Sequence, residues 1–540
     1  MNKLIECVPN FSEGRDKKVI EAIADAIRNT AGVKLLDVDP GYSTNRTVYT
    51  FVGDPSSVVE GAINAAKVAK EQIDMTKHTG EHPRMGAMDV CPFIPVRNVI
   101  MQECVDCSLE FGRRMGEELG LPIYLYEEAS NKDYRKSLPD IRKGEYEGFA
   151  QKIYQPEWKP DFGPAAFIPT WGATVTGARK FLIAYNVNII GTNNQAHRIA
   201  LNLRELGRGG EETGKLKDVK AIGWWVNEYN MAQVSMNLTD YHKTAPHSAF
   251  ESCKEEASNL NVAVAGSELV GLIPLEALLM AADYYIQKEN LFIIDENQKI
   301  RLAIERMGLN SISNFDPNKR IIEYLIKEEP NEPLASMTLR GFIEEVGART
   351  AAPGGGSVSA AIASMGVALA NMVAKLTYGV RKFEHLDGKM REIIPNFDST
   401  FRELIAKIDE DTNAFNDYIA AIRLPQNTDE EKHIRENEMQ NGLKKAINTP
   451  LSVMRLSSSI WYEFEEAAKV TNYASKSDLE VGVKALETGI WGAYRNVMIN
   501  MKDITDQEYI NSVTQEAKTI YENAVQKTKT ILEILDNRVD

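Results

Sequence analysis

The feature that most constrains the fold of this chain is a change of hydrophobic periodicity near residue 330. Up to about residue 325, short runs rich in β-branched residues alternate with amphipathic stretches of helical spacing. Beyond Ser336 the strand-like runs almost vanish. Segments with helical spacing replace them, among them 400–422, 429–447, 451–468 and 479–501. We therefore predict an α/β half fused to an all-α half that forms a helical bundle.

The α/β half contains the order β-α-β-β-α-β twice. This split βαβ pattern predicts an antiparallel sheet with helices on one face. The first copy has strands 4–8, 33–38, 47–52 and 90–96, a turn at 40–45, and helices 17–28 and 57–73. The second copy has strands 181–190, 219–226, 233–238 and 261–270 and helices 195–206 and 249–260.

The Gly- and Pro-rich stretch 156–171 is predicted to join these two subdomains, and a groove between them is a favoured place for a ligand. The segment Lys327–Pro333 is charged, contains two prolines and is typical of a linker. We predict subdomains at 1–180 and 181–326, a linker at 327–335 and a helical domain at 336–540.

Composition excludes several classes of protein. The 540 residues carry a formal net charge of -15, which argues against general nucleic-acid binding. Five cysteines do not make a disulfide scaffold, and the Cys104–Cys107 pair lacks a second pair, so we predict a structural role for it. The N-terminus lacks a signal-peptide pattern, and the polar residues within 358–376 favour a buried helix over a membrane span. We expect a soluble, cytoplasmic protein.

His78 and His82 are two of only seven histidines. Their i, i+4 spacing would suit a metal site on a helix, but Gly80 and Pro83 disfavour a regular helix there. No third ligand follows at a characteristic spacing, so we predict no metal.

The other interpretation is that His82 carries protons on a loop, because an imidazole titrates near neutral pH. Glu81, Arg84 and Asp89 lie close enough in sequence to orient or charge it. An ordinary surface or hydrogen-bonded histidine is the alternative.

The segment from Asp161 to Gly177 combines three glycines and two prolines with three aromatic residues. Glycines let a backbone approach a ligand closely, and aromatic rings can stack on a flat heterocycle. An interdomain connection is the alternative. Arg179 and Lys180 follow and can pair with carboxylates or lie solvated at the end of a strand.

In the helical half, the glycines 354–356 and Ser357 precede a long Ala-rich helix. Backbone N–H groups at such a helix start can hold an anion, but the Gly-Lys-Ser/Thr ending of a nucleotide P-loop is missing. Two interpretations stay open, Ser357 as the N-cap of the helix or a ligand-binding loop.

An acidic cluster, Asp409 to Asp411, lies within the predicted helix 400–422. Helical spacing places Asp411 in an apolar stripe and Asp409 about 200° away from it. A carboxyl group among apolar neighbours resists ionisation, so its pKa should rise into a range useful for proton transfer. A structural aspartate is the alternative. The other members of the stripe are Leu404, Ile408, Phe415, Tyr418 and Ile422.

Several motifs of the first half together resemble the glutamate formimidoyltransferase family: 8–14, 37–39, 43–49, 78–89 and 161–177. The resemblance implies transfer of a formimino group from N-formimino-L-glutamate to N5 of tetrahydrofolate. It gives His82 the catalytic acid/base role, with Asp39, Arg46 and Arg179 as further candidates for binding or orientation. One imidazole can take the proton of the attacking amine and return it to the departing glutamate nitrogen. The implied folate-binding residues are Gly163, Pro164, Ala165, Ala166, Phe167, Ile168, Pro169, Thr170, Trp171 and Gly172.

Motifs of the helical half resemble the formimidoyltetrahydrofolate cyclodeaminase family: 352–357, 411–415, 423–425, 477–479 and 493–497. The resemblance makes Asp411 catalytic, with Asp409 as the alternative register, and adds Gly354, Gly355 and Gly356 as candidates. The reaction closes a ring through N10 and releases ammonia, leaving cationic 5,10-methenyltetrahydrofolate. A carboxyl group can protonate the leaving nitrogen, and its conjugate base can stabilise the cation.

The whole chain therefore resembles the bifunctional formimidoyltransferase-cyclodeaminase family of histidine degradation. The resemblance implies polyglutamylated tetrahydrofolate as co-substrate, N-formimino-L-glutamate as the other substrate, no metal, and a ring-like homo-octamer. The alternative is a transferase whose helical half is a catalytically silent assembly or folate-binding domain.

Overall fold

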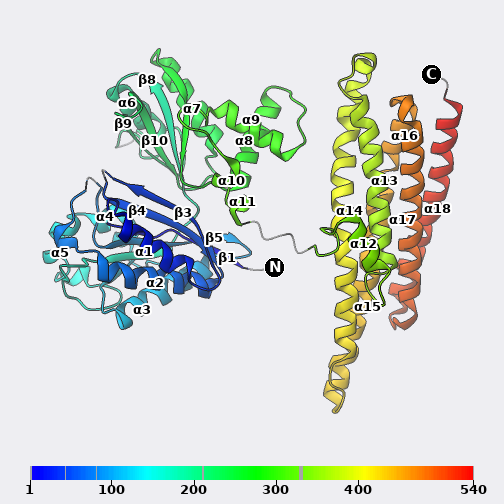
Figure 1. Cartoon of the computed structure of the whole chain (residues 1–540), viewed down its shortest axis with the longest axis horizontal. Helices are drawn as coiled ribbons and strands as arrows, with labels where there is room; N and C mark the ends of the chain where they lie inside the picture. The colour runs from blue at the N-terminus through cyan, green and yellow to red at the C-terminus, as the bar shows by residue number, and fades with distance from the viewer. Residues whose placement is uncertain (1–2, 43, 81, 210–211, 327–331, 539–540) are drawn as a thin grey trace. The chain divides into compact units, whose positions relative to one another are not determined.

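The computed structural model describes residues 3–42, 44–80, 82–209, 212–326 and 332–538. The chain forms two compact units, residues 1–327 and 328–540 (Figure 1). The first unit contains two sheets with their helices, and the second is helical, so the predicted fold class is confirmed. Residues 327–331 of the predicted linker lie outside the described residues.

The first subdomain contains the predicted β-α-β-β-α-β order. β3 pairs with β4, β4 with β1, and β1 with β5, all antiparallel, while the short β2 pairs with both β4 and β5. β3 continues through Gly41, two residues into the predicted turn, because its last residues still pair with Arg46 and Thr47 of β4. The elements are β1 (Leu4–Cys7), β2 (Asn10–Phe11), α1 (Lys17–Arg28), β3 (Val33–Gly41), β4 (Arg46–Gly53), α2 (Pro55–Gln72), η1 (Met75–Lys77) and β5 (Met88–Arg97).

This sheet continues beyond the predicted pattern. β7 lies between β5 and β6 and is parallel to both, so the prediction of a purely antiparallel sheet is wrong. Parallel neighbours need long crossovers, which α3 and the residues between β6 and β7 supply. Apolar residues of α3 pack on one face of the sheet and those of α4 and α5 on the other, so helices cover both faces. The elements are α3 (Met101–Glu118), β6 (Ile123–Glu127), η2 (Asp133–Arg135), α4 (Leu138–Arg142), α5 (Glu145–Lys152), η3 (Pro156–Trp158) and β7 (Thr174–Ala178).

The stretch 156–171 does not join the subdomains, contrary to the prediction. It precedes β7 and belongs to the first subdomain, and residues 179–182 make the connection. Two of the glycines in and beside this stretch adopt backbone conformations that other residues rarely adopt. Gly163 and Gly172 have φ of 77° and 79°, and a Cβ there would lie 2.0 and 2.1 Å from backbone oxygens.

The second subdomain repeats the same order in a four-stranded antiparallel sheet, β11-β8-β10-β9, as predicted. Further helices follow it. A small apolar cluster that includes Leu4, Leu272 and Ile322 packs the two subdomains together. The elements are β8 (Ile183–Ile190), α6 (Asn193–Leu203), β9 (Val219–Val226), β10 (Met231–Leu238), α7 (Pro246–Asn259), β11 (Ala263–Val270), α8 (Leu275–Lys288), α9 (Glu296–Met307), α10 (Pro317–Arg320) and α11 (Ile322–Ile326).

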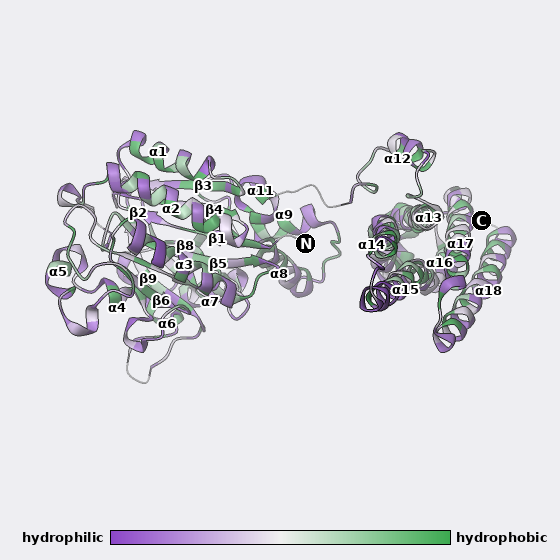
Figure 2. Cartoon of the chain, turned by 90° about the horizontal axis from the view of Figure 1, so that it is seen from below, coloured by the Kyte–Doolittle hydropathy of each residue, from purple (hydrophilic) through white to green (hydrophobic). Residues whose placement is uncertain are grey.

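The second unit is a bundle whose apolar positions face inward between the long helices (Figure 2). α13 is long and apolar enough to cross a membrane, but most of it is buried in the bundle, as predicted for 358–376. Gly366 of α13 and Gly482 of α17 meet so closely that a Cβ on Gly366 would lie 2.6 Å from the Gly482 oxygen. The elements are α12 (Leu339–Val346), α13 (Gly355–Thr377), η4 (Arg381–Leu386), α14 (Asp387–Ile422), α15 (Asp429–Ser459), α16 (Trp461–Val470), η5 (Tyr473–Ser475), α17 (Lys476–Asn500), η6 (Met501–Asp503) and α18 (Gln507–Asn537).

The predicted helix boundary between 447 and 451 is wrong, because α15 continues through Pro450. A proline inside a helix leaves the carbonyl four residues earlier without its usual donor. Here the Asn500 side chain of α17 donates to that carbonyl, Ala446 O, at 3.1 Å. Packing of a distant helix therefore satisfies the group that the proline frees.

Candidate functional site

A cavity of about 430 Å³ lies between the two subdomains of the first unit. One wall comes from β1, β3 and β4, and the other from residues 179–184 and 270–272. His82, Asp39, Arg46 and Arg179 all line it, although 140 residues separate the first and last of them in sequence. The predicted groove thus exists and brings together four of the predicted site residues.

The His82 ring has a defined tautomer. Its Nδ1 lies 2.7 Å from the carbonyl oxygen of Pro83. Because a carbonyl oxygen only accepts, Nδ1 must carry the proton of the neutral ring. Nε2 is then the nitrogen with a free lone pair, which is what a general base requires. Two residues of the motifs, Ser43 and Glu81, lie outside the described residues.

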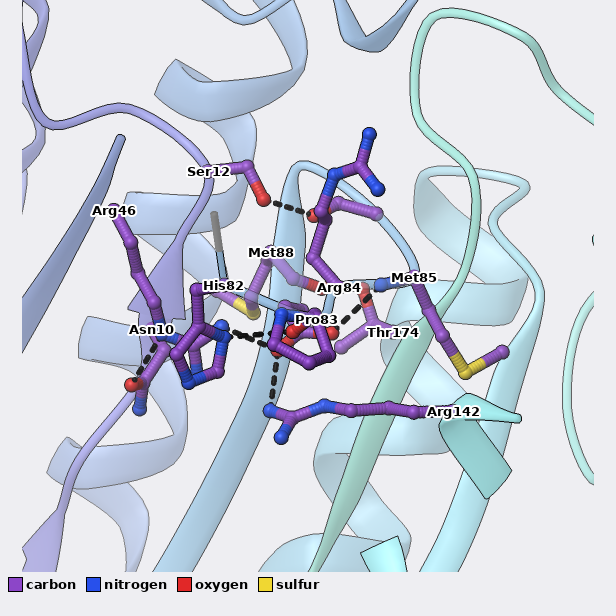
Figure 3. Close-up of polar contacts among 12 residues, drawn as sticks. Asn10, Ser12, Arg46, His82, Pro83, Arg84, Met85, Met88, Arg142 and Thr174 are labelled. Carbon is purple, nitrogen blue, oxygen red and sulfur yellow. Dashed lines mark hydrogen bonds and ion pairs between the residues drawn. The ribbon is translucent and has the colours of Figure 1, made fainter. Parts of the chain in front are cut away.

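Beside His82 lies a buried ionic cluster centred on Asp89, the second residue of β5. Figure 3 shows its two arginines, Arg46 and Arg142, near the His82 ring. Arg46 of β4 donates through Nη1 to Asp89 Oδ2 at 2.5 Å, and Arg142 of α4 donates to the same oxygen. The backbone N–H of Met85 donates to Oδ1 at 2.8 Å. The cluster therefore ties two elements to the segment that carries His82.

Burial and this cluster together set the charge state of His82. Burial and, after it, the nearby guanidiniums of Arg46 and Arg142 together lower the pKa of His82 to about 4, and the Pro83 hydrogen bond and Asp89 offset only part of this effect. The imidazole is consequently neutral at physiological pH and able to accept a proton.

Arg84, which the sequence placed near His82, points elsewhere (Figure 3). Its guanidinium binds the carboxylates of Glu147 at 2.6 and 2.9 Å and of Glu145 at 3.1 Å. Its Nε donates to Nδ1 of His78 at 3.3 Å.

We expect the acid limb of the transferase pH profile to move in opposite directions in two variants. Arg142→Met removes a positive charge beside His82, so the pKa of His82 should rise and the limb should shift up by about one pH unit. Asp89→Asn leaves two arginines unneutralised, so the limb should shift down. The measurement is kcat/KM against pH. Shifts of the same sign in both variants would contradict an electrostatic role, and activity of the helical unit in the same chain controls for folding.

The predicted folate loop, residues 163–172, lies at the surface next to this region. Its C-terminal end is fixed to the segment that carries His82, because Ala87 N donates to Trp171 O at 2.8 Å and Ala173 N donates to Met85 O at 3.1 Å. Trp171 is buried, while most of the loop is exposed. No residue of the loop is among the described residues that line the 430 Å³ cavity.

His78 has both ring nitrogens engaged by protein groups. Its Nε2 lies 2.8 Å from Asn45 O, and its Nδ1 accepts from Arg84. Over the described residues, no group of three or more His, Cys, Asp or Glu side chains has the arrangement of a metal site. Cys104 and Cys107 are buried on α3.

The second site lies where α14 crosses the N-terminus of α13. The half-buried Asp411 carboxylate of α14 accepts from the backbone N–H of Ser357, and the Ser357 hydroxyl lies 3.4 Å from its Oδ2. A Cβ on Gly356 would lie 2.1 Å from Asp411 Oδ1, so only glycine admits the carboxylate there. The glycine segment therefore receives a carboxyl group that the protein itself supplies.

Ser357 is not the N-cap of α13, contrary to one of the two interpretations. The N-cap is Gly354, and among the residues that the structure describes no side chain caps that end. Ser357 is buried within the first turn, where its hydroxyl also lies 3.1 Å from Thr412 Oγ1. Sequence reasoning did not connect Ser357 with Asp411, because only the packing of α13 on α14 brings them together.

Two opposing effects act on Asp411. Burial raises the pKa of the Asp411 carboxyl, as expected, and the hydrogen bonds from Ser357 oppose that rise. A carboxyl group with a raised pKa is suited to donate a proton near neutral pH.

Asp409 has a different environment. It is buried at 4% exposure and accepts from the backbone N–H groups of Leu334 and Ala335, at 2.8 and 3.0 Å. These bonds occupy both carboxylate oxygens and fix the segment before α12 to α14. The geometry gives Asp409 a structural role and leaves Asp411 as the candidate for chemistry.

Asp409→Ala is expected to destabilise the helical unit by about 2 kcal/mol, since one buried and one partly buried N–H group lose their acceptor. Denaturant unfolding followed by circular dichroism measures this change. Ring closure should persist under conditions where the variant is folded. Glu410→Ala, the exposed neighbour, is the matched control and should change stability little. Loss of ring closure by a folded Asp409→Ala protein would contradict this assignment.

Comparisons with known proteins cover nearly the whole chain. Residues 4–179 match the family model of the formiminotransferase domain, N-terminal subdomain. Residues 184–327 match the model of the formiminotransferase domain. Residues 338–519 match the formiminotransferase-cyclodeaminase model.

Full-length relatives also align with the chain. The formimidoyltransferase-cyclodeaminase of Dictyostelium discoideum is 62% identical over 540 residues, which is 100% of both chains. That of Mus musculus is 55% identical over 527 residues, 96% of this chain and 97% of the relative. The glutamate formimidoyltransferase of Streptococcus pyogenes serotype M1 is 44% identical over 291 residues, 54% of this chain and 95% of the relative.

Proposed function

The chain belongs to the formimidoyltransferase-cyclodeaminase family, and from this membership we propose that His82 and Asp411 carry its two reactions. The protein is a bifunctional folate enzyme of histidine degradation. It transfers the formimino group of N-formimino-L-glutamate to tetrahydrofolate, giving 5-formiminotetrahydrofolate and glutamate. It then cyclises that product to 5,10-methenyltetrahydrofolate with release of ammonia.

In the transferase unit, His82 acts first as a base. Its neutral ring takes the proton that N5 of tetrahydrofolate loses as it attacks the amidine carbon, through the free Nε2. The imidazolium formed lies beside Asp89, whose negative charge partly offsets the two arginines. Because the arginines disfavour this cation, it is a strong acid and readily returns the proton to the departing glutamate nitrogen.

Folate and the acyclic substrate would occupy the inter-subdomain cavity in this proposal. Arg46 and Arg179 are suited to the carboxylates of N-formimino-L-glutamate, and Asp39 to its amidine group. The loop 163–172 is assigned to folate by the family resemblance. Its root is bonded to residues 85–87, so the loop is fixed to the same segment as His82.

In the helical unit, Asp411 acts as an acid. The formimino nitrogen gains two protons before it leaves as ammonia: one is the proton that N10 loses as it bonds to the formimino carbon, and the Asp411 carboxyl group donates the other. The resulting carboxylate then stabilises the cationic methenyl product. The α13 N–H of Ser357 holds the side chain in place through this change.

One observation carries this assignment: the pKa of His82 is lowered and the pKa of Asp411 is raised, each in its own unit. A neutral imidazole can accept the proton of N5, and a carboxyl group with a raised pKa keeps its proton to a higher pH than an ordinary aspartate. Following methenyltetrahydrofolate by ultraviolet absorbance, with N-formimino-L-glutamate and tetrahydrofolate supplied, tests the complete sequence. Accumulation of 5-formiminotetrahydrofolate would favour the alternative of a silent helical half.

We propose polyglutamylated folate as the natural co-substrate. A second cavity of about 820 Å³ shares Arg179, Leu182 and Asn237 with the first and is also lined by Arg142, which lies beside His82, so the tail of a long ligand could extend from the His82 end into it. Its lining includes the basic residues Arg142, Arg204 and Lys220 among several acidic ones. We propose no metal cofactor, since His82 and Asp411 can supply both proton transfers.

We also propose a cytoplasmic homo-octamer, which the family resemblance supports. Apolar side chains of the helical unit, including Met365, Met372 and Trp491, are at least 38% exposed. Exposed apolar groups of this kind are typical of protein interfaces. Sedimentation equilibrium measures the assembly directly.

A further inference from the structure

Glu6 on β1 is a buried carboxyl group that the mechanism does not use. It is 2% exposed and lies in the wall of the 430 Å³ cavity. Among the described residues, no donor forms a hydrogen bond with its side chain. A buried polar group without a partner calls for an explanation, and a bound ligand is one.

The charges around Glu6 are mixed. Arg179 attracts its negative charge, whereas Glu323 of α11 repels it. Asp37, Asp39, Arg46 and His82 line the same cavity. Asp39 is exposed and Asp37 half-buried, so Glu6 is the most desolvated carboxyl group of this wall.

The position of Glu6 along the cavity separates it from the reacting atoms. Asn10, whose Oδ1 accepts from Arg46 Nε at 3.0 Å, marks the His82 end. Glu6 precedes Asn10 by four residues, which corresponds to about 13 Å of extended chain. Glu6 therefore cannot share the proton transfers of His82, and a role in binding is left.

We propose that Glu6 binds the donor edge of the pterin ring, its N3–H and 2-amino groups. An ionised carboxylate only accepts hydrogen bonds, so it selects N–H groups and repels the carboxylates of either substrate. The N3–H bond and one N–H bond of the 2-amino group are adjacent and point in the same direction. They can therefore donate two parallel hydrogen bonds to the two carboxylate oxygens. This inference rests on the proposed placement of folate in the cavity.

The geometry of the pterin agrees with this placement. N5, which must face His82, belongs to the reduced ring, whereas N3 and the 2-amino group belong to the other ring. A pterin with N5 at His82 thus directs its donor edge along the cavity, toward Glu6. The amidine of N-formimino-L-glutamate also donates, but it has to lie at the His82 end, where its carbon reacts.

Burial raises the pKa of Glu6 to about 7, against the attraction of Arg179. Two donors from a ligand would favour the ionised form and so strengthen binding at neutral pH. The group is thus kept near its titration point until a partner arrives.

The test compares tetrahydrofolate with 2-desamino-tetrahydrofolate in the full-length protein. Glutamate release at saturating N-formimino-L-glutamate reports transfer without involving the second site. We expect the native protein to prefer tetrahydrofolate by about 10- to 100-fold in kcat/KM. Glu6→Gln should raise the KM for tetrahydrofolate and bring this preference close to one. Asp37→Asn, a carboxyl group of the same wall, should keep the preference.

Three results would overturn the proposal. The first is a native protein that uses both folates equally well, which needs no variant and so does not depend on folding. The second is an unchanged preference in a Glu6→Gln protein that still closes the ring of supplied 5-formiminotetrahydrofolate. The third is a rise in KM for N-formimino-L-glutamate alone. Failure of the native protein to release glutamate from either folate would instead contradict the proposed function.

Discussion

Asp411→Asn is expected to reduce the kcat of ring closure by about 10³-fold, the scale of a lost general acid. Asparagine keeps the size of the side chain and can still accept from the Ser357 N–H, so the packing of α14 on α13 should survive. What it loses is the acidic proton that the leaving nitrogen needs. The measurement is the formation of methenyltetrahydrofolate from supplied 5-formiminotetrahydrofolate.

Two matched glycine variants extend this test beyond the chemistry of the carboxyl group. Gly356→Ala would place a Cβ within 2.1 Å of Asp411 Oδ1 and should displace the carboxylate, with loss of ring closure. Gly354→Ala is the control, because its Cβ would meet nothing closer than 3.8 Å and its backbone is extended. Transfer of the formimino group should continue in all three variants. Full ring closure by Asp411→Asn would remove Asp411 from the mechanism.

His82→Ala is expected to give the opposite pattern. Formimino transfer should fall by about 10³-fold, while ring closure of supplied 5-formiminotetrahydrofolate continues. The truncation opens space beside Arg46 and Arg142, and added imidazole should restore part of the transfer rate with the pH dependence of a free imidazole. Glutamate release measures the rate.

His78→Gln serves as the matched control for this variant. His78 belongs to the same segment, but protein groups occupy both of its ring nitrogens, so its loss should affect transfer far less than the loss of His82. Equal losses in the two variants would indicate a general disturbance of the segment. Transfer at the native rate by His82→Ala would exclude it as the proton carrier.

Elements of both subdomains show how much of the fold the local pattern of apolar residues predicts. The strand Val219–Val226 and the helix Lys17–Arg28 coincide with their predicted ranges. The apolar residues of each segment recur with the period of one kind of element, which alone places them all on its buried face. The repeated β-α-β-β-α-β order was readable for the same reason. Three predictions that depend on distant partners were wrong: a purely antiparallel first sheet, a connection between the subdomains at 156–171, and a helix boundary at Pro450.

The sequence by itself determined the two halves, the repeated order of the first half, and the motifs that contain His82 and Asp411. These features are local, since spacing along the chain dictates which side chains share a face. Only the tertiary structure decided how distant groups act on them. Arg46 and Arg142 are 43 and 53 residues from Asp89, yet they meet there and act together with burial to keep His82 a neutral base. Asp409 and Asp411 are two residues apart, yet their partners differ. Asp409 fixes the segment before α12, whereas Asp411 accepts a hydrogen bond from the first turn of α13. Coulomb energy and burial depend on distance through space, and periodicity carries no information about that distance.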